Sequence, residues 1–176
     1  MAITLHPSGK ITNSAGVNLT PTPMVDHWRM TNDSADGVEG TLTAWNQIST
    51  SNHFPGRMGS SMSISSGVWT FPDTGIYNII SNFAFFVGST NDLICQVWLR
   101  VSYDGGSNWN TVQSARFGAD TDSVHATIGN SYVLDVTDTS LVKIKFETDS
   151  FSSDTELRGD ADEGETNVTI IRLGDT

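Results

Sequence analysis

Short runs of strand-forming residues, each cut by glycine, asparagine, aspartate or proline, follow one another from residue 25 to the end of this 176-residue chain. Examples are VDHWRM (25–30), IYNIISNFAFFVG (76–88), LVKIKFETD (141–149) and NVTIIRLG (167–174). No apolar stripe with a helical period is sustained, and only 16% of residues are charged, against about 25% in an ordinary globular chain. The pattern predicts an all-β sandwich or barrel of about eight to ten antiparallel strands over residues 24–176.

Several of these runs carry large apolar residues on both faces. In residues 76–88, Tyr77 and its alternating neighbours share one face, whereas Ile80 and Phe86 lie on the other. Trp98 likewise lies opposite the apolar face of its own run. A monomeric sandwich needs one apolar face per sheet, so we expect Ile80, Phe86 and Trp98 to be covered by a subunit interface.

Residues 1–23 are different in character from the rest. Their short β-prone runs are cut by Pro-Ser-Gly and Ala-Gly, and they end in Pro21-Thr22-Pro23, a sequence that favours an extended, stiff connection. We interpret this segment as an extended arm that attaches the domain to another protein. The alternative is a disordered tail.

Charge and segment type exclude several classes of partner. The net charge of −11 disfavours nucleic acid and an anionic membrane surface, since both require patches of lysine and arginine. The start, MAITLHPSGK, lacks the features of a signal peptide, and no segment approaches the roughly 20 apolar residues of a membrane span. The single cysteine, Cys95, precludes an intrachain disulfide, and its apolar neighbours predict a buried side chain.

The stretch VWTFPDTGIYNI, residues 68–79, places a hard stop between two apolar runs. Pro72 cannot continue a sheet ladder, and Gly75 is able to adopt a positive φ. We expect Trp69 and Tyr77 to be buried on adjacent strands joined by the Pro72–Gly75 turn. The alternative is that both rings form an exposed platform for sugar stacking.

The longer stretch SSGVWTFPDTGIYNI, residues 65–79, resembles the signature of the complement-type globular head and tumour necrosis factor superfamily. The matching positions are Gly67, Trp69, Pro72, Gly75 and Tyr77. The closing run ETNVTIIRLG, residues 165–174, is similar to the last strand of that family. The resemblance implies a TNF-like jelly roll of antiparallel strands that forms compact homotrimers.

The chain lacks the collagen-like stalk, signal peptide and cysteine pair of the animal members, which argues against a complement or cytokine role. Bacteriophages use similar jelly rolls in tail fibres, knobs and capsid decorations. The resemblance therefore implies a non-enzymatic virion protein, made in the host cytoplasm and joined to other virion proteins by its N-terminal arm, with a display or host-attachment role. The alternative is a carbohydrate-binding module that recognises host surface glycans through Trp45 or Trp109.

Two further segments carry residues that suggest a site. SYDGGSNW, residues 102–109, resembles the Asp-box, a hairpin turn rather than a catalytic element, with Trp109 packed over it. The acidic run between Glu147 and Glu165 contains Asp160, Asp162 and Glu163, which are candidate calcium ligands. The alternatives for that run are a solvated loop or a pair of glycosidase carboxylates. The histidines have no zinc-site spacing, and apart from calcium we expect no cofactor.

Overall fold

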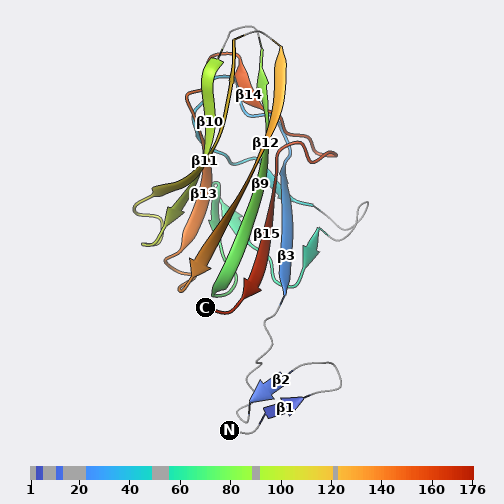
Figure 1. The fold of residues 1–176 in the computed structure, drawn as a ribbon, viewed down its shortest axis with the longest axis vertical. Helices are drawn as coiled ribbons and strands as arrows, with labels where there is room; N and C mark the ends of the chain where they lie inside the picture. The colour runs from blue at the N-terminus through green and yellow to red at the C-terminus, as the bar shows by residue number, and fades with distance from the viewer. Residues whose placement is uncertain (1–2, 6–10, 14–22, 49–55, 89–91, 121–122) are drawn as a thin grey trace.

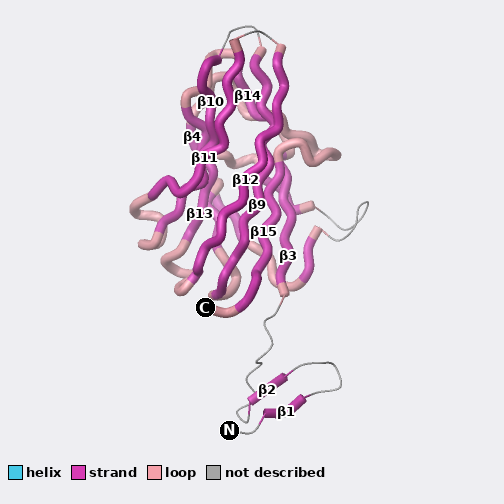
Figure 2. The backbone as a smooth tube through the Cα atoms, viewed as in Figure 1, coloured by secondary structure: helices cyan, strands magenta, loops and turns pink. Residues whose placement is uncertain are grey.

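The computed structural model describes residues 3–5, 11–13, 23–48, 56–88, 92–120 and 123–176. Two antiparallel sheets pack face to face around one core, and Figure 2 shows strands and loops without a helix in the part of the chain described. The predicted all-β jelly-roll sandwich is therefore confirmed. No helix long and apolar enough to cross a membrane occurs among these residues.

The seven-stranded sheet has the order β12-β9-β15-β3-β5, with β14 paired to β9 and β6 paired to β3 (Figure 1). Strand β9 pairs with β12 over its whole length and with β15 on its other side. The strands are β3 (Met24–Met30), β5 (Trp45–Gln47), β6 (Arg57–Met58), β9 (Gly75–Val87), β12 (Val124–Val136), β14 (Thr155–Leu157) and β15 (Asn167–Gly174).

The six-stranded sheet has the order β11-β10-β13-β8-β7, with β4 paired to β13. Its long hairpin, β10 and β11, encloses the Asp-box turn at residues 103–109. The strands are β4 (Gly40–Thr41), β7 (Ser63–Ser65), β8 (Val68–Thr70), β10 (Asp92–Ser102), β11 (Asn110–Ala119) and β13 (Lys143–Asp149).

The described part of the two sheets contains more strands than the eight to ten expected, because several runs are divided between short elements. The run at residues 39–49 gives β4 in one sheet and β5 in the other. Each of these short strands has only two or three residues. A periodicity argument cannot detect a chain that changes sheets after so few residues.

An aromatic cluster fills the space between the sheets. Trp69 lies at its centre, with ring centroids 5.2 Å from Trp28, 5.5 Å from Trp45 and 6.0 Å from Phe146. Such tilted and edge-on contacts add to the free energy gained from burial alone. Cys95 is fully buried nearby in the core, as expected, and desolvation raises the pKa of its thiol to about 12.

The segment between β8 and β9 takes the chain from one sheet to the other. Trp69 and Tyr77 are both completely buried, as predicted, but they do not lie on adjacent strands: β8 belongs to the six-stranded sheet and β9 to the seven-stranded one. The Tyr77 hydroxyl donates to the Asp73 carbonyl at 2.8 Å and ties the crossing to β9. The adjacency prediction was wrong because a Pro-Gly break does not reveal whether the next strand returns to the same sheet.

Glycine at position 75 is required by the backbone. Its φ is 147°, and a Cβ there would lie 2.5 Å from the Gly174 carbonyl oxygen. Pro72 precedes it in the turn, and Gly67, with φ 77°, makes the tight turn between β7 and β8. The five motif positions therefore have structural roles: two buried rings and three turn residues.

A buried carboxylate joins β3 to the segments that flank it. Asp26 is fully buried and accepts hydrogen bonds from the Met62 backbone N–H at 2.7 Å, the Ser61 hydroxyl at 3.0 Å and the Gln47 amide at 2.5 Å. These three donors replace the water that the carboxylate loses on folding. Asp26 thereby holds β5 and the segment leading to β7 against β3.

The N-terminal strands β1 (Ile3–Leu5) and β2 (Ile11–Asn13) form a small antiparallel sheet of their own. Among the described residues they pair with no strand of the two large sheets (Figure 1). The other residues of the expected arm, apart from Pro23, lie outside the described residues. The domain boundary at residue 23 and the attachment role of the arm stay predictions.

Replacing Trp69 with alanine tests the importance of the aromatic cluster. We expect Trp69→Ala to lower the free energy of unfolding by about 3–5 kcal/mol, because it leaves a cavity between the sheets. The control is Val38→Ala, whose side chain is 55% exposed and which should change stability by less than about 0.5 kcal/mol. Urea unfolding at a fixed protein concentration measures both, and equal stabilities would contradict the central role of Trp69.

Candidate functional site

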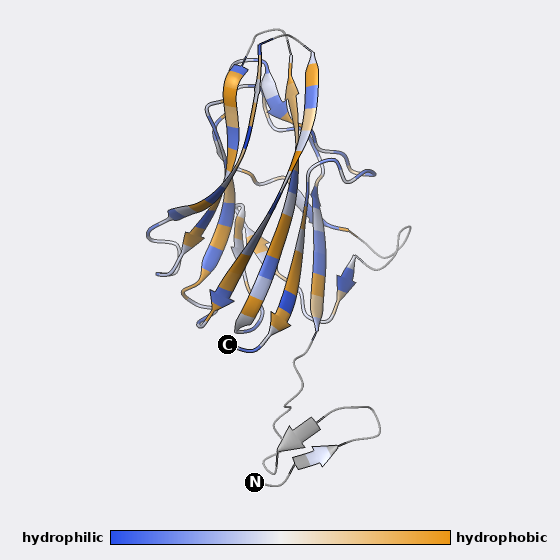
Figure 3. Cartoon of the chain, in the orientation of Figure 1, coloured by the Kyte–Doolittle hydropathy of each residue, from blue (hydrophilic) through white to orange (hydrophobic). Residues whose placement is uncertain are grey.

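We call the outward side of β12, β9, β15 and β3 the seven-strand face. The second row of β9 side chains lies on this face. Along β9 every odd-numbered residue is buried, and every even-numbered residue is half-buried. Figure 3 shows how apolar and polar residues alternate along the strands. Ile80 and Phe86 therefore point away from the core, as the sequence predicts, and both are only half-buried.

Apolar side chains continue across neighbouring strands on this face. Asn78 of β9 is flanked in register by Val133 of β12 and Ile171 of β15, and Ile171 is followed by Val25 of β3. The side chain of Val133 is 57% exposed. Met58, which pairs with Val25, is 49% exposed. The apolar row is therefore continuous from Ile171 through Val25 to Met58, and Asn78 separates it from Val133.

Neutral polar side chains on the seven-strand face bond to one another. The Asn82 amide donates to Asn167 Oδ1 at 3.1 Å, and the Ser131 hydroxyl donates to Asn78 Oδ1 at 2.9 Å. Gly129 lies opposite Asn82, and a Cβ at that position would come within 2.9 Å of Asn82 Oδ1. The lack of a side chain at Gly129 leaves room for the asparagine pair, and a paired amide is less costly to cover than a free one.

Two histidines that sequence reasoning did not select lie on this face. His27 Nδ1 and Thr169 Oγ1 are joined by a hydrogen bond of 2.6 Å, in the same row as Ile80. His125 lies against Phe86, with ring centroids 4.6 Å apart. Strand alternation alone predicts on which face of the sheet each histidine lies. Their partners, Thr169 for His27 and Phe86 for His125, come from strands distant in sequence.

Two arginines border the seven-strand face. Arg29, across from Asn167 on β3, has a buried Nε without a hydrogen-bond partner. Arg158 lies 5.9 Å from the Phe86 ring centre and pairs with Asp33 at 2.9 Å and with Glu156 at 2.7 Å. Arg158 is therefore already neutralised by carboxylates of its own chain, whereas Arg29 is the cation of this face that retains an unused donor.

Trp98 does not lie with Ile80 and Phe86. It projects from β10 on the outward side of the six-stranded sheet, which is the opposite surface of the sandwich. Its half-buried ring lies 5.5 Å from the Arg100 guanidinium, so this chain itself covers part of the ring. The structure thus places the three residues on two different sheets, and the subunit interface expected for them stays a prediction.

The two tryptophans proposed for glycan contact have different environments. Trp45 packs at the edge of the core against Trp69 and Phe146, and its indole N–H donates to the Leu42 carbonyl at 3.0 Å. It is therefore not a free ring for sugar stacking. Trp109 is half-buried on the six-stranded side, with Lys145 Nζ 4.5 Å from its ring centre.

The turn before Trp109 is held by a carboxylate. Asp104 Oδ1 accepts from the Asn108 backbone N–H at 2.8 Å and from the Ser102 hydroxyl at 2.7 Å, and Oδ2 accepts from the Asn108 amide. The bonds from Asn108, followed by that from Ser102, lower the pKa of Asp104 to about 2. The Asp-box segment is a hydrogen-bonded hairpin turn, as predicted, and it fixes the position of Trp109 directly before β11.

The candidate calcium ligands lie in an exposed turn. Asp160 Oδ1 accepts hydrogen bonds from the backbone N–H groups of Asp162 and Glu163, at 2.5 and 2.9 Å. These bonds lower the pKa of Asp160. In the ranges the structure describes, no group of three or more acidic, histidine or cysteine side chains is arranged to hold a metal. Calcium binding stays a prediction, with the Asp160 carboxylate directed at its own backbone.

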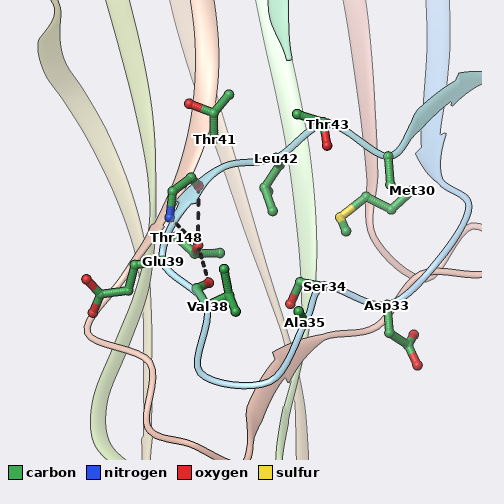
Figure 4. Close-up of a pocket in the computed structure, with 12 residues that line it drawn as sticks. Met30, Asp33, Ser34, Ala35, Val38, Glu39, Thr41, Leu42, Thr43 and Thr148 are labelled. Carbon is green, nitrogen blue, oxygen red and sulfur yellow. Dashed lines mark hydrogen bonds between the residues drawn. The ribbon is translucent and has the colours of Figure 1, made fainter. Parts of the chain in front are cut away.

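A pocket of about 240 Å³ lies under the connection from β3 to β5 (Figure 4). Met30 and Leu42 form its apolar wall, and Thr148 fixes its rim by donating to the Val38 carbonyl at 3.0 Å and accepting from the Gly40 N–H at 3.1 Å. Its polar groups are largely occupied in holding the loop. The pocket therefore has structural hydrogen bonds but no cluster of catalytic side chains.

Comparison with known proteins identifies the fold. A scan against protein families and a search of curated proteins returned no match. The structure is similar to murine APRIL crystallised at pH 5.0, with a TM-score of 0.61 and 16% identity over 86% of this chain and 99% of that chain. It is also similar to Eiger TNF from S. frugiperda, with a TM-score of 0.63 and 8% identity over 89% and 96% of the two chains. The chain thus has a TNF-like jelly-roll fold.

The environment of His27 predicts a pH dependence. Desolvation lowers the pKa of His27 from its ordinary 6.5, Asp26 opposes the shift and Arg29 adds to it. Since the folded pKa is the lower one, the unfolded chain binds this proton first as the pH falls. The free energy of unfolding should therefore decrease as the pH falls through 6.5 and stop decreasing below the folded pKa.

Urea unfolding between pH 8 and pH 5 measures this effect in the protein and in His27→Gln, which keeps a polar side chain opposite Thr169. The variant should lose stability less steeply over the same pH range. Parallel curves for the two proteins would show that His27 does not cause the pH dependence.

Proposed function

We propose that this chain is a non-enzymatic structural protein of a bacteriophage particle. Its jelly-roll domain forms a homotrimer through the seven-strand face, and its N-terminal segment joins the trimer to other virion proteins of a tail fibre, knob or capsid decoration. The exposed head then serves display or host attachment. The observation that carries the proposal is the row of apolar side chains, including Ile80 and Phe86, that β9 directs away from its own core.

The free energy for association comes from covering this face. Full burial of one large apolar side chain contributes about 1.5–3 kcal/mol. The polar groups between the apolar ones are neutral and already paired, as in Asn82–Asn167 and His27–Thr169. Covering them leaves few unsatisfied donors, so neighbouring copies arranged around a threefold axis can cover this face.

The virion part of the proposal is supported by other features. Residues 65–79 resemble the signature of the complement-type globular head and tumour necrosis factor superfamily, and phages use similar jelly rolls in fibres and decorations. The hairpin of β1 and β2 pairs with neither large sheet among the described residues, as a segment that binds another protein would. The glycan-binding alternative through Trp45 loses its support, since that ring packs into the core.

A charge placed in the seven-strand face should prevent trimer formation. Light scattering of the unaltered chain should give three times the mass of one chain, and Ile80→Glu should give a monomer, because each copy would bury an unpaired carboxylate. The matched control is Leu141→Glu, an exposed residue outside this face, which should stay trimeric. A folded Ile80→Glu variant that remains a trimer would contradict the proposed interface.

Removing residues 1–23 separates folding from attachment. The shortened chain should remain a folded trimer, because the two large sheets are complete without β1 and β2. It should no longer be incorporated when particles are assembled in its presence. Loss of folding in the shortened chain, judged by circular dichroism, would mean that the segment belongs to the core.

A further inference from the structure

The outward side of β10, β11 and β13, here called the six-strand face, carries cations in a chain of net charge −11. Arg100 and Lys145 lie in register on neighbouring strands, Arg116 lies across from Gln96, and Lys143 pairs with Thr70 at the start of β13. Four of the nine lysines and arginines in the sequence therefore lie on one face. Repulsion of anions by the acidic chain is weakest at this surface.

Two tryptophans on this face are tied to its cations through one carboxylate. Arg100 lies 5.5 Å from the Trp98 ring centre, and Lys145 lies 4.5 Å from that of Trp109. Glu147, between them, accepts from Arg100 at 2.6 Å and also pairs with Lys145. The charged groups and rings are thus held in place before any ligand arrives, which reduces the entropy lost on binding.

A second row of polar side chains lies beside Trp98. The Arg116 Nε–H donates to Gln96 Oε1 at 2.8 Å, and the Gln96 amide donates to Asp149 Oδ2 at 2.6 Å. Arg116 is exposed, and its other guanidinium N–H groups have no hydrogen-bond partner in the described part of the chain. The row therefore presents fixed donors and acceptors side by side along the edge of an aromatic ring.

Arg100 is already engaged within the face, so Arg116 is the arginine that can pair with a ligand. The Arg100 Nη1 donates to Glu147 at 2.6 Å, its Nη2 lies 3.5 Å from the Trp109 carbonyl oxygen, and its Nε is buried. A planar guanidinium beside a ring, as Arg116 lies beside Trp98, suits a carboxylate attached to a flat-faced molecule.

We propose that the six-strand face binds an acidic saccharide, whose ring packs on Trp98 and Trp109 while its carboxylate pairs with Arg116. Sugar rings present C–H groups to aromatic faces, and sugar hydroxyls both donate and accept. Glu147 and Asp149 within the face accept hydrogen bonds from hydroxyls but repel a densely acidic peptide. The mixture of rings, cations and carboxylates therefore fits a saccharide with few charges better than a polyanion.

This inference gives a ligand class to the host-attachment role proposed above, and it rests on that role but not on the trimer. The six-strand face is on the side of the sandwich opposite to the seven-strand face. A homotrimer built on the seven-strand face leaves three copies of the saccharide site exposed. Several weak sites on one particle then bind a glycan-covered surface with high avidity.

Isothermal titration with sialyllactose, a saccharide that carries a single carboxylate, tests the proposal on the full chain. We expect saturable binding that quenches tryptophan fluorescence, and about tenfold weaker binding for Trp98→Ala and for Arg116→Gln. The matched control is Arg57→Gln, which removes an exposed arginine from the other sheet and should bind like the unaltered chain. Thermal melting of each variant establishes that it is folded.

The outcomes separate this inference from the trimer proposal, because light scattering is recorded on the same samples. A folded trimer that does not bind sialyllactose would overturn the saccharide site alone. The site would also be overturned by equal binding of poly-glutamate or of neutral lactose, or by Trp98→Ala and Arg116→Gln variants that bind as tightly as the unaltered chain. A monomer that binds sialyllactose, with the loss in both variants, would support the site and contradict only the trimer.

Discussion

The strict alternation of side chains along β9 is the constraint on which the rest of the structure depends. This strand is 13 residues long and lies inside the seven-stranded sheet, bonded to β12 on one side and to β15 and β14 on the other. A shift of its register by one residue would bring Asn78 and Asn82 into the core and expose Tyr77 and Phe83. Because that exchange is so unfavourable, β9 fixes the position of its neighbours, and with them both the aromatic core and the seven-strand face.

Features that depend on local sequence were predictable, and features that depend on long-range pairing were not. Alternation placed Ile80 and Phe86 away from the core, and the residues around Asp104 indicated a hairpin turn, because both signals lie within a few residues. The sequence does not reveal which sheet a strand joins. Trp69 and Tyr77 therefore turned out to be on opposite sheets, and Trp98 on the opposite outer surface from Ile80. Trp45 looked like a surface ring because its core partners, Trp69 and Phe146, are distant in sequence.

Polar residues at buried positions show the same limit. The pattern of residues 24–30 places Asp26 on the side of Met24 and Met30, so its burial follows from the alternation. Its donors are Gln47 of the short strand β5 and Ser61 and Met62 of the loop before β7, and no periodicity predicts the approach of these segments. His27 and Thr169, which belong to the first and last strands of the domain, are brought together in the same way. The position of a candidate site in such a sandwich therefore depends on how the strands pair. A sequence motif identifies only the turns that permit that pairing.

The difference between the two outer faces decides which of them a second copy can cover. On the seven-strand face the central polar groups are neutral and bonded to each other, so removing water from them is inexpensive compared with removing it from ions. Its unpaired cation, Arg29, lies on β3, two strands away from β9. On the six-strand face Arg100, Lys145 and Glu147 form a charged network at the centre, and hydrogen bonds from Lys145 and Arg100 overcome desolvation to hold the pKa of Glu147 below its usual range. Covering that network with an identical one would bring like charges together without adding a new partner. This difference supports the proposed self-association through the first face, which would leave the second exposed to water and to ligands that carry the opposite charge.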